Sequence, residues 1–144
     1  MGHIGLTPQN VSEKKGFKVQ GQTAEQAMQI MRQAALWEKR HAFSILLECI
    51  PSVVASAITK ALKIPTIGIG AGPGCDGQVL VFQDLVGTFT KFKPRFVKQY
   101  AELNTLMKKA VGEYKKDVRL GRFPESKHSF LMSAIERDKF LGKR

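Results

Sequence analysis

The apolar run Ile45–Ile50, interrupted by the carboxylate of Glu48 and followed by Pro51, constrains the fold more than any other stretch. A short run that is apolar on both faces is typical of a strand buried in a parallel sheet. Burying a carboxylate is unfavourable unless the group is paired, protonated or used. Two interpretations of Glu48 therefore stand: a salt bridge with a lysine at the strand's exposed end, or a functional group.

Predicted strands and helices alternate around this run, with short links. Residues 1–6 predict the end of a strand, and residues 8–22 predict a polar loop of a length that is usually functional. Thr23 and Gln26 match a capping box, which opens a helix that ends near His41. One face of this helix is apolar, with Ala27, Ile30, Met31, Ala34 and Trp37 at helical spacing.

The pattern repeats further along the chain. A strand is predicted at 43–49, then a helix with Pro51 as its first residue, then a strand at 65–69 that runs into the glycine loop Gly68–Gly72. Strands and helices that alternate in this way are typical of parallel βα units.

The second half of the chain gives a weaker pattern. Residues 78–83 fit either a helix or an extended segment, and we favour a brief helix, followed by a strand at 85–88. The longest helix is predicted from Pro94 onward, with an apolar stripe that ends at Val118. Residues 121–130 have no regular period, 133–141 predict a short helix, and 131–144 form a C-terminal tail. All 144 residues are expected to form one domain.

The predicted fold class is α/β with parallel strands. Three or four such strands make half of an eightfold barrel, which needs about 250 residues, or part of an open doubly wound sheet. Because the first predicted strand has no helix before it, we expect either a fragment or a sheet edge that another copy covers.

The net charge of +11 is concentrated in residues 91–144, which hold fifteen Lys and Arg against six Asp and Glu. A basic region of this kind can bind nucleic acid, an acidic membrane surface or an anionic ligand, or can form a solvated helix face. The absence of a nucleic-acid motif and of interleaved aromatic residues disfavours nucleic acid.

Nothing in the sequence predicts a membrane or secreted protein. No apolar run approaches the length of a membrane span, and the N-terminus does not have the pattern of a signal peptide. Cys49 and Cys75 do not make a disulfide framework, and Cys49 is expected to be a small buried residue. These features favour the cytoplasm.

Three unusual features fall where parallel βα folds bind ligands, at the carboxyl ends of the strands. They are His3, expected at the end of the first strand, Glu48 and the glycine loop. Their coincidence favours Glu48 as a general base, with a neighbouring histidine that donates to an enolate or carboxylate oxygen. A structural histidine remains the alternative for His3.

The other candidate groups carry weaker predictions. The glycine loop lacks the lysine of a P-loop, so a tight turn is the commoner explanation, with anion binding left open. His41 and His128 have no partners at metal-ligand spacing and are expected to be structural. No acidic cluster in the sequence holds a divalent metal by itself.

Seven strings, in order and with matching spacing across residues 2–130, resemble the ketopantoate hydroxymethyltransferase family. They are GHIGLTPQ (2–9), GFKVQG (16–21), LLECIP (46–51), IPTIGIGAG (64–72), DGQVLVFQD (76–84), KPRFVKQYA (93–101) and FPESKHSF (123–130).

The resemblance implies a (β/α)8 barrel of the phosphoenolpyruvate-mutase-like group, of which this chain would supply about strands 5–8 with their helices. It implies transfer of a hydroxymethyl group from 5,10-methylenetetrahydrofolate to 3-methyl-2-oxobutanoate, giving 2-dehydropantoate, by a homo-oligomer (a decamer in the family) that uses Mg²⁺. Glu48 matches the family's general base, and His3 matches a histidine that contacts the keto acid.

The resemblance also implies what this chain lacks. The family's metal-binding aspartates, and a lysine that contacts the keto acid, belong to the first half of its barrel, so no metal ligand is assigned here. We expect a truncated or fragmentary form of the enzyme. The alternative is a non-catalytic oligomeric remnant without the metal site.

Overall fold

A computed structural model describes residues 1–7 and 18–142, and its packing divides the chain into two compact units, Met1–Ala101 and Glu102–Arg144. The first unit holds a parallel sheet in the order β1-β2-β3-β4. These strands are Gly2–Gly5, Ile45–Glu48, Thr66–Ile69 and Gly77–Gln78. The predicted parallel α/β architecture is confirmed, whereas most of the predicted loop 8–22 lies outside the described residues.

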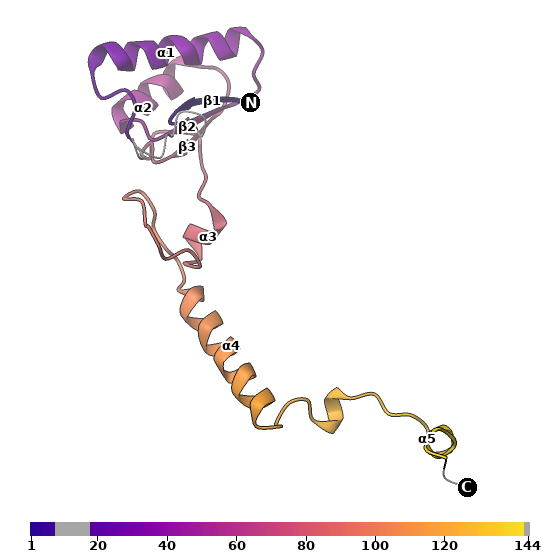
Figure 1. Cartoon of the computed structure of the whole chain (residues 1–144). Coiled ribbons are helices and arrows are strands. Elements are labelled where there is room, and N and C mark those ends of the chain that lie inside the picture. The colour runs from indigo at the N-terminus through magenta and orange to yellow at the C-terminus, as the bar shows by residue number, and fades with distance from the viewer. Residues whose placement is uncertain (8–17, 143–144) are drawn as a thin grey trace. The chain divides into compact units, whose positions relative to one another are not determined.

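Helices α1 (Ala24–Lys39) and α2 (Ser52–Ala61) lie together on one face of the sheet (Figure 1). Alternate strand residues point toward these helices and form the core with them. The core cluster contains Ile4, Ile30, Ala34, Ile45, Leu47, Ile50, Val54, Ala55, Ile58 and Ala71. The residues between them in the first two strands, including His3, Leu46 and Glu48, are only half-buried.

The predicted capping box at the start of α1 is confirmed. The Gln26 backbone N–H donates to Thr23 Oγ1 at 3.2 Å, and Gln26 Oε1 accepts from the Thr23 N–H at 3.4 Å. Ile30 and Ala34 carry the buried side of the helix. Pro51 is the cap that precedes α2 rather than its first residue, so that prediction was displaced by one position.

Two predictions between residues 76 and 101 were wrong. Strand β4 comes first and the short helix α3 (Phe82–Leu85) follows it, in the reverse of the predicted order. No helix starts at Pro94, because the Tyr100 N–H donates to the Leu85 carbonyl at 2.8 Å and Val97 is buried. These tertiary interactions replace the bonds that a helix would have made.

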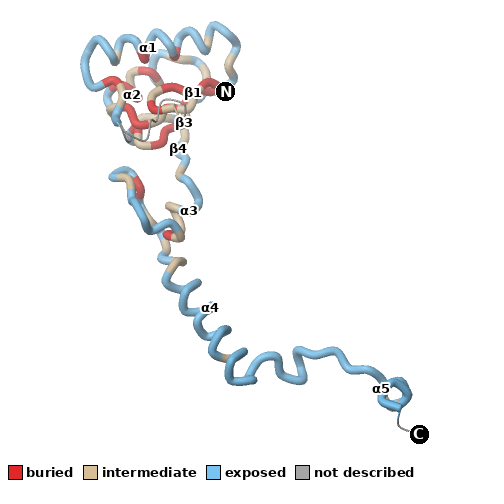
Figure 2. The backbone as a smooth tube through the Cα atoms, viewed as in Figure 1, coloured by how far each residue is buried: buried red, intermediate tan, exposed pale blue. Residues whose placement is uncertain are grey.

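The second unit consists of α4 (Leu103–Arg119), a 3₁₀ turn (Ser126–His128) and α5 (Ala134–Phe140). The predicted terminal helix at 133–141 is confirmed. None of the described residues of this unit is buried (Figure 2). Among the helices that the structure describes, none has both the length and the hydropathy that crossing a membrane requires.

The last residue of β1 is a glycine for a steric reason. Gly5 has φ +95° and pairs with Glu48, and a Cβ there would collide with the Glu48 carbonyl oxygen. The next residue, Leu6, donates its N–H to that same oxygen at 2.9 Å. Glycine therefore allows β1 to follow β2 closely to the end of the strand.

Candidate functional site

Glu48 and His3 are brought together on the half-buried face of the sheet. Glu48 ends β2, while His3 lies within β1 opposite Leu46, not at the strand's end as predicted. Residues two apart in a strand share a face, so Leu46 and Glu48 project to the same side as His3. His3 Nε2 lies 2.9 Å from Glu48 Oε2.

This contact bears on the lysine salt bridge that was one of the two interpretations of Glu48. Within residues 1–7 and 18–142 its partner is His3, and no lysine of those ranges forms the predicted salt bridge with it. With the carboxylate ionised, His3 Nε2–H donates to Oε2, which leaves the other carboxylate oxygen available to take a proton. The side chains of His3 and Glu48 are 30% and 22% exposed, so both remain accessible to a small molecule.

The backbone turns at Cys49, directly after Glu48. Its φ of 50° is unusual for a residue other than glycine, and its N–H donates to the Ile69 carbonyl at 2.9 Å. Burial, and secondarily the charge of Glu48, raise the pKa of the Cys49 thiol. The thiol is therefore neutral near pH 7, in agreement with the prediction of a small buried residue.

Close packing explains the glycine loop at the end of β3. A Cβ on Gly70, which has φ +63°, would lie 2.8 Å from Cδ1 of Phe96, and a Cβ on Gly72 would overlap Ser52. The loop brings the backbone against an aromatic ring on one side and the start of α2 on the other. This packing supports the tight-turn interpretation.

Glu48 lines an apolar cavity of about 690 Å³ within the first unit. Its walls include Ile69 at the end of β3, Val81, and the three rings of Phe89, Phe92 and Phe96. Asp84 on α3 supplies a second carboxylate. No sequence pattern predicted that Val81, Asp84 and the three phenylalanines line a cavity with Glu48. The available signal was the presence of three phenylalanines within eight positions, at 89, 92 and 96.

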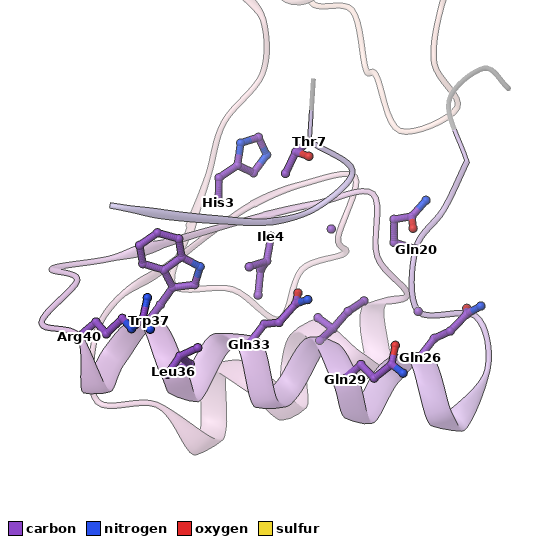
Figure 3. A pocket seen from close by; sticks show the side chains of 13 residues that line it. His3, Ile4, Thr7, Gln20, Gln26, Gln29, Gln33, Leu36, Trp37 and Arg40 are labelled. Carbon is purple, nitrogen blue, oxygen red and sulfur yellow. The ribbon is translucent and has the colours of Figure 1, made fainter. Parts of the chain in front are cut away.

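A second cavity, of about 630 Å³, runs between β1 and α1 (Figure 3). Ile4 points toward the helix and His3 points to the other side of the strand, with Gln33 and Trp37 projecting from α1. Among the described residues β1 pairs only with β2, so this cavity follows an open sheet edge. Glu48 is not among its lining residues.

Neither remaining histidine belongs to these cavities. His41 follows the end of α1 with φ 61°, and His128 Nδ1 accepts the Glu125 N–H at 3.2 Å in the 3₁₀ turn. Within residues 1–7 and 18–142, no group of three or more His, Cys, Asp or Glu lies together in a way that could hold a metal. The described residues therefore do not fit the Mg²⁺ site that the resemblance implies.

Comparison with known proteins gives a consistent match. The family model for ketopantoate hydroxymethyltransferase matches residues 1–126. The 3-methyl-2-oxobutanoate hydroxymethyltransferase of Clostridium beijerinckii is 55% identical over 136 residues, which cover 94% of this chain and 50% of the relative. Proteins of the same name from Clostridioides difficile and Heliobacterium modesticaldum are each 52% identical, over 139 and 132 residues.

These two alignments cover 96% and 92% of this chain, but only 50% and 48% of the relatives. The chain thus spans about half the length of the curated relatives it matches, which agrees with a partial barrel.

Proposed function

The chain belongs to the ketopantoate hydroxymethyltransferase family, and from that premise we propose that it supplies half of a hydroxymethyl-transfer site. The substrate would be 3-methyl-2-oxobutanoate, the donor 5,10-methylenetetrahydrofolate and the product 2-dehydropantoate. The observation that most supports this proposal is the 2.9 Å contact between His3 Nε2 and Glu48 Oε2, at the wall of an apolar cavity.

Glu48 acts as the general base in this proposal. One carboxylate oxygen is held by His3 Nε2–H, and the other takes the proton from the branched carbon next to the ketone. Fixing one oxygen orients the other toward the substrate before the reaction begins. The exposed part of the His3 ring is available for the contact with the keto acid that the resemblance assigns to it.

The overall conversion consumes one water. The carbon–hydrogen bond at the branched carbon is replaced by a bond to the methylene carbon of the donor. That carbon loses both of its bonds to the folate nitrogens, and water supplies the hydroxyl oxygen. The three hydrogens released from substrate and water end on the new hydroxyl group and the two nitrogens of tetrahydrofolate.

The resemblance implies that some of the residues that hold the keto acid lie outside this chain. We therefore propose that activity requires a complementing polypeptide, equivalent to the half of the relatives that this chain does not match. Assembly as a homo-oligomer, which the resemblance implies, is part of the same proposal, and sedimentation velocity of the complemented protein tests it.

The test isolates the proton transfer from the rest of the reaction. The chain is co-expressed with the unmatched half of the Clostridium beijerinckii relative, and proton NMR follows deuterium exchange at the branched carbon of 3-methyl-2-oxobutanoate without folate. Glu48→Gln is expected to slow exchange by about 10²–10⁴-fold, because a positioned base contributes that much. Glu25→Gln, an exposed glutamate in the first turn of α1, is the matched control.

Each result bears on a different part of the proposal. Equal exchange in the wild type and Glu48→Gln would remove the base role. Turnover by the 144-residue chain alone would show that no second half is needed. Failure of the complemented complex to form product or to exchange would favour the non-catalytic remnant.

A further inference from the structure

We propose that two copies of this chain close one eight-stranded parallel barrel, in which the free edge of β1 in each copy pairs with the free edge of β4 in the other. In the absence of the complementing polypeptide, a second copy of the chain occupies both edges. The inference concerns the assembly of the first unit. Its tests measure association and not activity, so it fails separately from the proposed hydroxymethyl transfer.

Strand β1 has a free edge in the part of the chain that the structure describes, because it pairs only with β2. The N–H groups of Gly2 and Leu6 donate to the carbonyls of Ser44 and Glu48, at either end of β2, each at 2.9 Å. Backbone groups alternate sides along a strand, so the N–H of His3 points away from β2. An added strand can accept this hydrogen bond.

Strand β4 has the corresponding free edge at the other side of the sheet. Among the described residues it pairs only with β3, and the Val79 N–H directly after it donates to the Gly68 carbonyl at 3.0 Å. The same alternation turns the N–H of Gln78 away from β3. The sheet therefore ends in two edges that can each pair with a further strand.

Both edges are bordered by cavities with exposed apolar side chains. Leu36 and Trp37 of α1 line the cavity of about 630 Å³ beside β1 (Figure 3), and they are 48% and 41% exposed. A cavity of about 480 Å³ adjoins β4, and Val79 and Tyr100 in its wall are 43% and 67% exposed. Covering these side chains with another chain removes apolar surface from water, which favours association.

One face of the sheet is only partly shielded from water. Helices α1 and α2 lie on the other face (Figure 1), while His3, Leu46 and Glu48 project away from them and are half-buried. Parallel sheets are normally covered on both faces. Closing the sheet into a barrel turns this face into the interior, where the side chains of the strands cover one another.

Strand direction and strand number favour a second copy as the occupant. All strands of the sheet are parallel, so a two-fold axis along them places β1 of each copy beside β4 of the other, in the same direction. A contact between two β1 edges would leave both β4 edges free. Four strands from each copy make eight, the number at which side chains fill the interior of a barrel.

Sedimentation velocity of the 144-residue chain alone tests the assembly. The wild type is expected to form a dimer whose proportion rises with concentration. Gln78→Pro removes the edge N–H of β4, and the dissociation constant is expected to rise about 30-fold or more, because both junctions lose a donor. Gln78→Ala, which also loses the side-chain bond to the Gly72 carbonyl but keeps the backbone N–H, is the matched control.

A second pair of variants tests the other side of the junction. His3→Pro removes the edge N–H of β1, and His3→Ala keeps it. A junction between β1 and β4 requires that both proline variants weaken the dimer and that each weakens it more than its alanine control. Weakening by only one of the two proline variants would indicate pairing between like edges, and would overturn the inference. Equal effects of proline and alanine would also overturn it.

Amide hydrogen exchange of the wild-type chain keeps the test independent of how the variants fold. On dilution from dimer to monomer, the N–H groups of His3 and Gln78 are expected to lose protection. Those of Leu6 and Val79, which are bonded within the chain, are expected to keep theirs. Unchanged protection of His3 and Gln78 in a dimer that has dissociated would contradict edge pairing.

Two further results would overturn the closed dimer. One is a wild-type chain that is monomeric alone and associates only with the unmatched half of the Clostridium beijerinckii relative, because the edges would then accept only that polypeptide. The other is a ladder of larger oligomers, because successive edges would then fail to close after two copies.

Discussion

The two units of this chain both contain helices with apolar stripes, yet among the described residues only the first unit has a buried core. In Met1–Ala101, α1 and α2 cover a parallel sheet, and Leu47 and Ala55 are completely shielded from water. In Glu102–Arg144 most apolar residues of α4 are exposed, with Leu106 at 61% and Val111 at 65%. A similar pattern of apolar residues thus gives different burial.

The difference shows what amphipathicity can and cannot establish. An apolar stripe predicts that a helix has a side suited to packing, but the sheet supplies the surface that α1 covers. The second unit contains no strand among its described residues. Its helices therefore depend on their own backbone bonds, caps and local pairs such as Lys109–Glu113.

The largest expected effect comes from removing core volume in the first unit. Leu47→Ala removes a side chain with no exposed area between the sheet and its helices, and is expected to lower the free energy of unfolding by about 2–5 kcal/mol. Leu106→Ala makes the same change on α4 and is expected to stay within about 0.5 kcal/mol. Equal losses in urea unfolding would contradict the contrast between the units.

A smaller effect is expected from the helix caps. Thr23→Ala removes the hydroxyl that caps α1, and because α1 packs on the core the whole first unit should lose about 1 kcal/mol. Ser133 caps α5 in the same way, by accepting the Glu136 N–H. Ser133→Ala should reduce helicity by circular dichroism without moving the unfolding midpoint. A shift in that midpoint would show that α5 contributes to the core unit.

The smallest effect concerns acid stability. The Thr66 backbone N–H and then its hydroxyl donate to the Asp76 carboxylate at 2.8 and 3.0 Å, which lowers the pKa of that carboxyl. Because the pKa of Asp76 is lower in the folded than in the unfolded protein, its ionised carboxyl stabilises the fold fully above the unfolded pKa of about 4. This stabilisation is lost as the pH falls through the folded pKa.

In Asp76→Asn, the free energy of unfolding should therefore fall less steeply than in the wild type as the pH drops below about 4. The corresponding change in the second unit, Asp138→Asn, should leave that decline as it is, because its ion pair with Arg137 is exposed. Parallel curves for the wild type and Asp76→Asn would show that the Thr66 contacts do not favour the ionised carboxyl.

Local patterns predicted the described strands and helices before residue 70 well, because local and tertiary preferences agree there. The apolar run before Pro51 forms β2, and the capping box starts α1 at Ala24. The closeness of His3 and Glu48 followed from the rule that the carboxyl ends of neighbouring parallel strands meet at one edge. The position of His3 within β1 did not follow, because the register of that pairing is not encoded locally.

Residues 76–101 were mispredicted because long-range contacts decide their structure. The Val79 N–H binds the Gly68 carbonyl, and the Tyr100 N–H binds the Leu85 carbonyl. Such bonds have no local sequence pattern, and Pro94 is compatible with a loop as well as with a helix start. The same contacts arrange Phe89 and Phe96 around the cavity, so the cavity could not be predicted from periodicity.

Gly5 can serve as a marker when the sequences of related proteins are compared. The absence of a side chain at Gly5 lets the end of β1 lie against the carbonyl of Glu48, and so keeps His3 within reach of the Glu48 carboxylate. A paralogue that retains both the histidine and the glutamate but carries any larger residue at this position would have its strands forced apart. The residue at position 5 would then distinguish related proteins that keep the contact between the histidine and the glutamate from those that keep the two residues without the contact.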